Sequence, residues 1–284
     1  MSLESSSLER CDDCIVVVPC FNEAKRLDPQ AFGDFLERTP DVTLLFVDDG
    51  STDDTPLLLE QLRQQNSRQV STMRLTSNVG KAETVRQGIQ AALERRPSMV
   101  GYWDADLATP LDAISRFREV LRARPEVVLV MGSRVALMGR HIRRSAVRHF
   151  LGRVFATAAS LIVDLPVYDT QCGAKLFRVT PATSALFNEP FHSRWFFDVE
   201  ILARMVVSSR HGSGALAQNI IYEYPLEEWH DVPGSRLRIM DYLTAGVDLT
   251  AICWRYRLRP AAADVYTPST ASQPESSIVP QDNR

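Results

Sequence analysis

The chain has 284 residues and a formal net charge of −3, and 45% of its residues are hydrophobic while 24% are charged. This composition is typical of a globular protein and argues against a disordered or membrane-embedded chain, and the length suits one sizeable α/β domain. The small negative charge also excludes a general attraction to nucleic acid.

The two ends of the chain differ in composition from its middle. Residues 1–13 are polar and acidic, so we expect an N-terminal extension that is neither a signal peptide nor a membrane anchor. Residues 259–284 are rich in Pro, Ser, Thr and Gln and are predicted to be a disordered tail. Cys11 and Cys14 form a C-x-x-C, but no second pair follows, so zinc or redox chemistry is not expected. A single domain is therefore predicted over residues 14–258.

Apolar strand patterns alternate with helical patterns in the first half of this domain. The sequence predicts strands at 14–21, 42–49, 71–76, 99–106 and 126–133, and helices at 30–38, 55–66, 81–96 and 112–123. This alternation is typical of β-α-β units, and it predicts a mostly parallel sheet with helices on both faces. Ligands bind such sheets at the carboxyl ends of the strands.

The second half is richer in helix. The patterns predict a long helix at 145–163, a strand at 174–179, a helix at 197–209, a strand at 219–224 and a last helix at 237–256. We divide the domain accordingly into two halves, 14–134 and 135–258. No run reaches the ~18 apolar residues of a membrane-spanning helix, because the longest candidate, 154–163, ends at Asp164.

Carboxylates follow three of the predicted strands. Glu23 follows the first strand, Asp48 and Asp49 end the second, and Asp104 and Asp106 end the fourth. Parallel strands place these ends along one edge of the sheet, where a site is expected. Other acidic residues near helix starts have a simpler explanation as helix caps, namely Asp53, Asp54 and Asp112.

The pair Asp104 and Asp106 forms a D-x-D pattern with no Cys or His nearby. Two carboxylates of this spacing suit a hard divalent cation with oxygen ligands. Mg²⁺ takes one or two protein carboxylates and completes its shell with phosphate oxygens and water. The pattern predicts a site for a metal and a diphosphate, although a D-x-D alone is common by chance.

Several motifs accompany this pair in a fixed order. They are VVVPCFNE, FVDDGSTDDT, NVGKAETVRQG, YWDADLATP, VMGSR, YDTQCGAKLF, HSRWFFDVE and EEWHDVPGSRL. Over residues 14–250 this series resembles family 2 glycosyltransferases of the GT-A fold. Within them it is most similar to the dolichyl-phosphate β-glucosyltransferases, through D-T-Q-C-G and R-W-x-F-D-V-E, and polyprenyl-phosphate mannosyltransferases are more distant relatives.

The resemblance implies a GT-A (Rossmann-like) fold with a nucleotide-sugar half, 14–134, and a helical acceptor half, 135–258. It implies a divalent cation, Mg²⁺ or Mn²⁺, and inverting transfer of glucose from UDP-glucose to a dolichyl-type phosphate. The roles that it implies are base and ribose contacts for Pro19, Phe21, Glu23 and Asp48, nucleotide contacts for Asp49, Lys81 and Asp104, metal binding for Asp104 and Asp106, a sugar contact for Asp198, and stabilisation of the leaving group by Arg236.

A basic stretch marks the acceptor half. Residues 127–163 contain six arginines and no acidic residue, which favours an anionic partner. By the resemblance, the acceptor phosphate is bound by Arg134, Arg144, Ser145 and Arg148. A phosphate monoester is already ionised near neutral pH, so it needs no general base.

The helix predicted at 145–163 carries an apolar stripe, which consists of Val147, Phe150, Leu151, Val154, Ala158 and Leu161. The stripe allows two interpretations, a core-facing surface or a peripheral contact with a membrane. The second interpretation places the protein in the cytoplasm, at the cytosolic membrane face.

Alternative functions also fit the sequence. A GT-A enzyme could use GDP-mannose or a small soluble acceptor, a nucleotidyltransferase could use the same scaffold, and a nucleotide-binding module would have no turnover. The pattern departs from the family at Ala82, where a second glycine is usual, and at Arg236, where many relatives have lysine. The oligomeric state is left open.

Overall fold

The structure is a computed structural model that describes residues 13–143, 146–211, 216–230, 232 and 239–258. Its centre is a seven-stranded sheet of order β3-β2-β1-β4-β7-β5-β8. The strands are β1 (Cys14–Cys20), β2 (Val42–Asp48), β3 (Val70–Arg74), β4 (Met99–Trp103), β5 (Leu129–Ser133), β7 (Ala174–Arg178) and β8 (Ile221–Pro225). Neighbours are parallel except where β7 runs antiparallel between β4 and β5. The prediction of a mixed, mostly parallel α/β sheet is confirmed.

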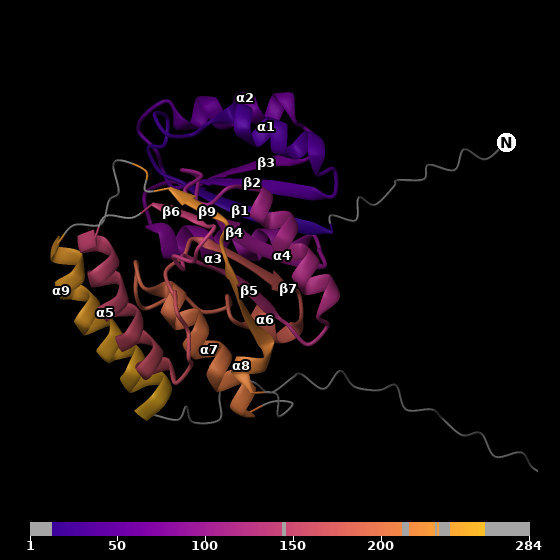
Figure 1. Cartoon of the computed structure of the whole chain (residues 1–284). Helices are drawn as coiled ribbons and strands as arrows, with labels where there is room; N and C mark the ends of the chain where they lie inside the picture. Colours follow the sequence, from indigo (N-terminus) through magenta and orange to yellow (C-terminus); the bar gives the residue numbers. More distant parts are fainter. Residues whose placement is uncertain (1–12, 144–145, 212–215, 231, 233–238, 259–284) are drawn as a thin grey trace, which may run out of the picture.

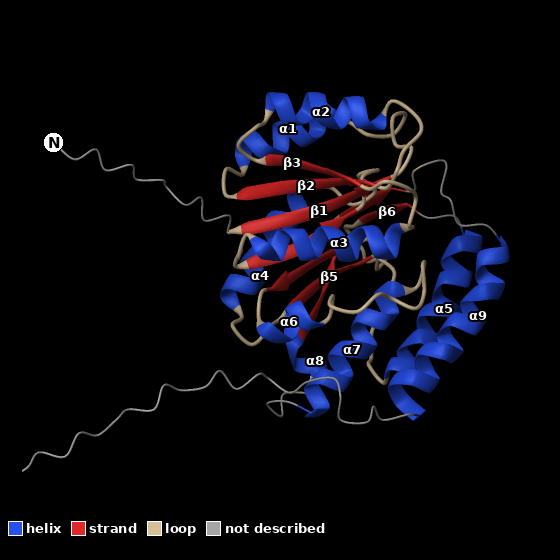
Figure 2. Ribbon diagram, turned by 180° about the vertical axis from the view of Figure 1, so that it is seen from behind, coloured by secondary structure: helices blue, strands red, loops and turns tan. Residues whose placement is uncertain are grey.

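Helices cover both faces of the sheet (Figures 1 and 2). One face carries α1 (Pro29–Arg38), α2 (Thr55–Gln65) and α4 (Asp112–Ala123). The other face carries α3 (Lys81–Glu94) and α7 (Phe197–His211), with α5 (Ala146–Val163) and α9 (Ile239–Cys253) beside them. A short parallel pair lies apart from the main sheet and consists of β6 (His141–Arg143) and β9 (Glu228–His230).

Strand β1 shows why its sequence is a continuous apolar run. Ile15 and Val17 pack toward α3, whereas Val16 and Val18 pack toward the face of α1, α2 and α4. Successive side chains of a strand point to opposite faces, so a strand that is covered on both sides has no polar alternation. Cys14 shares this burial, which raises the pKa of its thiol to about 12. Cys11 lies outside the described residues.

The observed elements lie close to the predicted ranges, with a few differences. Four short elements were not predicted, namely β6, β9, α6 (Pro181–Ala185) and α8 (Ala217–Ile220). The last helix ends at Cys253 and continues as a π-helix over Trp254–Leu258. No helix in the described ranges is long and apolar enough to cross a membrane. The boundary of the domain at 258 remains a prediction.

The predicted helix caps are only partly correct. Asp53 does act at the start of α2, because its Oδ1 accepts the backbone N–H of Thr55 at 3.0 Å, while Asp54 makes no side-chain cap bond. Asp112 is not a cap, since it is the first residue of α4 and forms an ion pair with Arg38 at 3.0 Å. An acidic residue in the first helical turn still interacts favourably with the helix dipole.

Glu200 of α7 ties together several segments of the acceptor half. Its carboxylate is fully buried and accepts hydrogen bonds from the backbone N–H of His192, from Arg204 at 2.8 Å and from the hydroxyl of Tyr256 at 2.8 Å. Burial disfavours the charge, but the hydrogen bond with the His192 ring, 2.9 Å from Oε1, and the charge of Arg204 outweigh it, so the pKa of Glu200 lies below its usual value. The carboxylate is therefore a structural anchor.

We expect Glu200→Gln to lower the free energy of unfolding by about 2 to 4 kcal/mol, because it leaves the partly buried guanidinium of Arg204 without its carboxylate. Urea denaturation measures the loss.

The stabilisation by Glu200 also depends on pH. Since the folded pKa of Glu200 is lowered, its contribution to stability is present above the unfolded pKa of about 4.3 and is lost as pH falls through the folded value. The matched control is Glu60→Gln, which removes an exposed pair with Arg63 and should leave the urea midpoint unchanged. Equal midpoints for both variants would contradict the anchor role.

Candidate functional site

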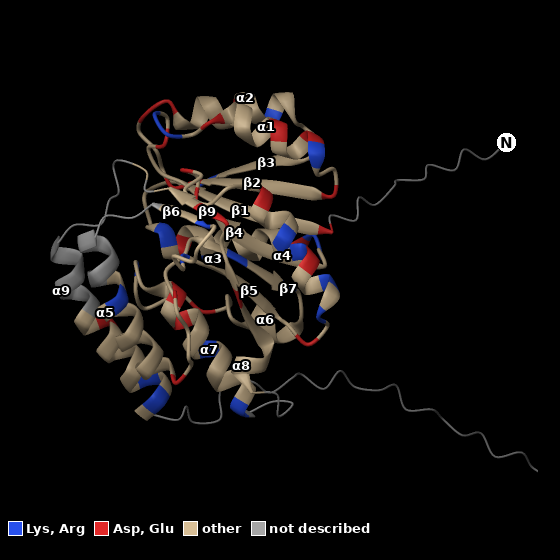
Figure 3. Cartoon of the chain, in the orientation of Figure 1, with Lys and Arg blue, Asp and Glu red and all other residues tan. Residues whose placement is uncertain are grey.

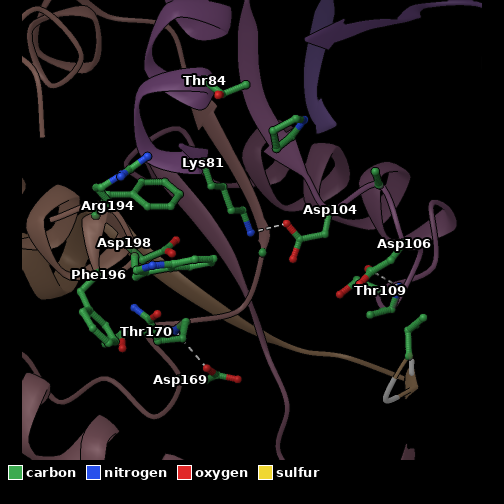
Figure 4. Close-up of a pocket in the computed structure, with 18 of the residues that line it drawn as sticks. Lys81, Thr84, Asp104, Asp106, Thr109, Asp169, Thr170, Arg194, Phe196 and Asp198 are labelled. Atoms are coloured by element: carbon green, nitrogen blue, oxygen red, sulfur yellow. Dashed lines mark hydrogen bonds and ion pairs between the residues drawn. The ribbon is translucent and has the colours of Figure 1, made fainter. Parts of the chain in front are cut away.

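A cavity of about 580 Å³ opens at the carboxyl ends of β1, β2 and β4 (Figure 4). Its wall contains residues from both halves of the domain. Most of the site residues expected from the sequence line it, namely Pro19, Phe21, Glu23, Asp49, Lys81, Asp104, Asp106, Arg134 and Asp198. The tertiary structure therefore brings together groups that are up to 179 residues apart in the chain.

Of the other expected residues, Asp48 is described and lies outside this wall. Asp48 lies behind it, where its Oδ1 accepts the N–H of Ser51 at 3.0 Å and its Oδ2 is 3.2 Å from Arg74 Nε. Arg144, Ser145 and Arg236 lie outside the described residues, and Arg148 lies in α5 with a side chain that is not described.

Backbone and side-chain hydrogen bonds hold the D-x-D loop in place. The buried indole of Trp103 donates to the carbonyl of Thr109 at 2.9 Å, and the N–H of Asp104 donates to the carbonyl of Gly173 at 3.0 Å. Asp106 Oδ1 accepts the N–H of Ala108 at 3.1 Å. A Cβ on Gly173 would lie 1.9 Å from Asp104 Oδ2, so only glycine leaves room for this carboxylate.

Two cations approach the two carboxylates of this loop. Lys81 Nζ lies 2.5 Å from Asp104 Oδ1, and Arg26 Nη1 lies 3.9 Å from Asp106 Oδ2. Burial and the charge of Asp104 both raise the pKa of Asp106 above its usual value. The loop thus holds two close negative charges whose repulsion a bound cation would relieve.

These carboxylates fit a hard divalent cation, because they offer only oxygen ligands at the mouth of a cavity. Among the residues that the structure describes, no three His, Cys, Asp or Glu side chains gather closely enough to form a complete metal site. The remaining ligands would have to come from a phosphate group and water, which is the usual arrangement for Mg²⁺.

Asp49 shapes the loop that begins α3. Its two carboxylate oxygens accept the N–H groups of Val79 at 2.7 Å and Gly80 at 2.9 Å. Gly80 has φ +93°, and a Cβ there would lie 2.9 Å from Arg194 Nε. The loop therefore places Lys81 at the start of the helix and leaves space for the guanidinium of Arg194 beside it.

The arginines of the cavity differ in how they are paired. Arg134 donates to both carboxylate oxygens of Asp169, at 2.6 and 2.8 Å, and Arg153 stacks on Tyr168 with its guanidinium 3.8 Å from the ring centre. Arg194 has no partner among the described residues, and it lines the cavity. Arg134 can contact an acceptor phosphate only in competition with Asp169, whereas Arg194 is available to an anion.

Sequence reasoning missed several residues of this site. Asp169, Thr170 and Gln171 precede the Cys172-Gly173 pair in the same motif, and all three line the cavity. The side-chain atoms Thr170 Oγ1 and Gln171 Nε2 are buried without a hydrogen-bond partner in the described structure. The sequence did contain one signal for these residues. Lys175 is a charged residue within the apolar strand 174–178, and a charged side chain that is buried there needs polar partners nearby.

Comparisons with known proteins agree with this arrangement. Residues 15–183 match the family described as glycosyl transferase family 2. A dolichyl-phosphate beta-glucosyltransferase of Drosophila melanogaster is 33% identical, with 85% of this chain and 74% of that protein covered. One of Trichomonas vaginalis is 30% identical, with 85% and 71% covered. A crystal structure of glucosyl-3-phosphoglycerate synthase from Mycobacterium tuberculosis with Mn²⁺ and UDP superposes with a TM-score of 0.60 at 18% identity, covering 84% and 79%.

The repulsion between Asp104 and Asp106 predicts that removing one of the two charges stabilises the metal-free protein. Because the folded pKa of Asp106 is raised, its charged form opposes folding, and Asp106→Asn should raise the melting temperature of the metal-free protein by about 1 to 3 °C at pH 7. Stability of the unsubstituted protein rises as pH falls through this raised pKa, so the difference should shrink there. Calorimetry measures both. Asp112→Asn, at an exposed pair, is the control and should give no gain; a lower melting temperature for Asp106→Asn would contradict the interpretation.

Proposed function

Because the chain belongs to glycosyl transferase family 2, we propose that its cavity binds UDP-glucose and that the enzyme transfers the glucose, with inversion, to a dolichyl-type polyprenyl phosphate. The observation that supports this most is the D-x-D loop at the carboxyl end of β4, whose Asp104 pairs with Lys81 in the wall of a cavity of about 580 Å³. Curated relatives that cover most of the chain are named as dolichyl-phosphate beta-glucosyltransferases.

The donor half supplies groups for the nucleotide. Pro19, Phe21 and Glu23 follow β1 and form the part of the wall that we assign to the base and ribose. Lys81 extends toward Asp104 (Figure 4) and would bind the diphosphate, since its ammonium lies at the N-terminal end of α3, where the helix dipole also favours negative charge. Asp49 contributes by holding this loop in place rather than by direct contact.

Asp104 and Asp106 would hold the divalent cation, Mg²⁺ or Mn²⁺, and the cation would neutralise the charge that develops on the departing diphosphate. The chain itself adds Lys81 and Arg26 near these carboxylates, so positive charge surrounds the leaving group. Arg236, outside the described residues, is proposed to assist from the segment of the sequence that precedes α9.

No histidine lines the cavity within the described part of the chain. This fits an acceptor that needs no general base, because a phosphate monoester carries negative charge at neutral pH and can attack the anomeric carbon directly. We assign acceptor binding to the wall formed by α5 and the segment before α7, where Arg153 and Arg194 lie, with Arg148 in the first turn of α5. Positioning of the two substrates then supplies much of the rate.

An apolar surface on α5 and α9 favours an acceptor that is a lipid. Val154 and Leu161 lie seven residues apart on α5, and Val247 and Trp254 lie seven residues apart along α9 and the π-helix. The two helices lie side by side (Figures 1 and 2), and Arg257 donates to the carbonyl of Leu161. These four side chains are each more than half exposed, as is Leu258.

The apolar stripe of α5 therefore does not face the core as a whole. The core-facing residues are Ala156, Ala159 and Val163, while Val154 and Leu161 point outward. We propose that this surface rests on a membrane, with exposed Arg255 and Arg257 near anionic headgroups. Figure 3 shows basic residues in blue at the lower end of this pair of helices. The opposite side of α5 lines the cavity through Gly152, Arg153 and Phe155, so an isoprenoid chain could reach the site along this helix.

The donor assignment predicts a selective stabilisation. UDP-glucose with Mg²⁺ or Mn²⁺ should raise the melting temperature more than GDP-mannose does, because a ligand that binds only the native state adds to apparent stability. Differential scanning fluorimetry with and without metal measures this, and Asp106→Asn should lose the metal-dependent part. Metal-independent stabilisation by GDP-mannose would favour the alternative suggested by a polyprenol monophosphomannose synthase of Mycolicibacterium smegmatis, which is 26% identical over 58% of this chain.

The membrane proposal predicts a local effect of polar substitutions. Leu161→Gln combined with Trp254→Gln should reduce partitioning onto anionic liposomes, measured by flotation, by about a hundredfold or more, because each of the two exposed apolar side chains contributes roughly 1.5 to 3 kcal/mol when it is buried in lipid. The matched control is Leu57→Gln on α2, which is equally exposed and lies on the other side of the molecule (Figure 1). Activity on a water-soluble short-chain acceptor should be retained. Equal flotation of all three proteins would favour a soluble acceptor.

A further inference from the structure

The described structure contains a buried charged group that the proposed chemistry does not use. Lys175 is in the middle of the sheet on β7, and its side chain has no exposed surface. Its ammonium donates to the carbonyl oxygens of Thr170 at 3.1 Å and Cys172 at 2.9 Å, and to Asp198 Oδ1 at 2.5 Å. Three acceptors require three N–H groups, so the side chain is the charged ammonium rather than the neutral amine.

Tyr102 of β4 reinforces this arrangement. Its hydroxyl donates to the same Oδ1 of Asp198, and its ring lies 5.6 Å from the ammonium of Lys175. Burial and the charge of Asp198 raise the pKa of Tyr102 well above its usual value, so the hydroxyl keeps the proton that it donates. Two donors therefore hold one oxygen of Asp198, in the first turn of α7.

The other oxygen of Asp198 is left for the cavity. Asp198 lines the cavity, and Oδ2 has no partner among the described residues. In Figure 4, Asp198 lies on the far side of Lys81 from Asp104, and the charge of Asp198 contributes to the raised pKa of Lys81. Asp198 therefore lines the same cavity as Lys81 and Asp104, the proposed diphosphate and metal contacts.

The same ammonium fixes a second part of this wall. Its bonds to the carbonyls of residues 170 and 172 bracket Gln171, and both Thr170 and Gln171 line the cavity. The side-chain atoms Thr170 Oγ1 and Gln171 Nε2 lie buried in this wall without hydrogen-bond partners in the described structure. Unpaired buried polar atoms cost free energy unless a ligand satisfies them. Lys175 thus joins two segments of the cavity wall, residues 170–172 and Asp198.

We propose that Thr170, Gln171 and Asp198 form the wall that binds the hydroxyl groups of the transferred hexose, and that Lys175, with Tyr102, is the positioning residue of this wall. The inference rests on the proposed function, because it takes the ligand to be a nucleotide sugar. Lys175 touches no substrate. It acts by fixing the rotamer of Asp198 and the backbone of residues 170–172.

Isothermal titration with UDP and with UDP-glucose, in the presence of Mn²⁺ and without acceptor, separates the hexose contacts from the nucleotide contacts. Asp198→Asn and Lys175→Met should each weaken UDP-glucose binding by about tenfold, the effect of losing a hydrogen bond to a charged group. The Kd of UDP should stay within about twofold. Tyr102→Phe, which keeps the ring and removes only the hydroxyl, should give a smaller loss of the same kind and serves if Lys175→Met fails to fold.

A double-mutant cycle tests whether Lys175 acts through Asp198. The double variant should bind UDP-glucose about as well as Asp198→Asn alone, whereas multiplied losses would overturn the positioning role. Arg118→Met is the matched control, since it removes another buried cation, bonded to Asp41 at 3.0 Å on the opposite face of the sheet. It should lower the melting temperature and leave both affinities unchanged.

The remaining outcomes separate this inference from the proposed function. If the unsubstituted protein binds UDP with Mn²⁺ but neither binds nor turns over UDP-glucose, the donor assignment fails and the inference fails with it. A second outcome would overturn only the positioning role. If the protein uses UDP-glucose, but Lys175→Met and Tyr102→Phe lower the affinities for UDP and UDP-glucose equally or change neither affinity, the donor assignment is supported and the positioning role is wrong.

Discussion

The antiparallel strand β7, inserted between β4 and β5, is the constraint on which the site depends. Its register pairs Ala174 with Trp103, so the residue before it, Gly173, lies directly beside Asp104 at the end of β4. A parallel strand in this place would bring the opposite end of its sequence to the cavity. Because β7 runs backward, the segment 169–173 enters the site together with the strand ends of the nucleotide half.

Charge in the cavity is balanced mostly by pairs that already exist. Lys81 faces Asp104, Arg26 faces Glu23 and Asp106, and Arg134 is held by Asp169. Such pairs keep side chains in place before a ligand arrives, which limits the reorganisation that binding requires. Two groups depart from this balance. Burial and the charge of Asp104 raise the pKa of Asp106 in spite of Arg26, and Arg194 has no partner among the described residues. Both are expected where a cation and a phosphate bind.

One helix connects the proposed chemistry to the proposed membrane surface. The side of α5 that holds Arg153 and Phe155 lines the cavity, while Val154 and Leu161 are exposed on another side. Because a helix has 3.6 residues per turn, neighbouring residues of α5 can lie on different sides of it, one side toward the cavity and another toward the outside. A polyprenyl phosphate has a charged head and an apolar tail, and these two surfaces match the two parts of such a molecule.

The sequence by itself determined the family, the alternation of strands and helices, and most residues of the cavity, because apolar periodicity and short motifs are local properties. It did not determine the antiparallel direction of β7, the pairing of Arg134 with Asp169, or the orientation of the α5 stripe. Each of these depends on contacts between residues that are far apart in the chain or between faces of neighbouring elements. Lys175 shows the reason most directly: its sequence position marks an unusual charge within a strand, but only the folded chain brings Asp198 to it.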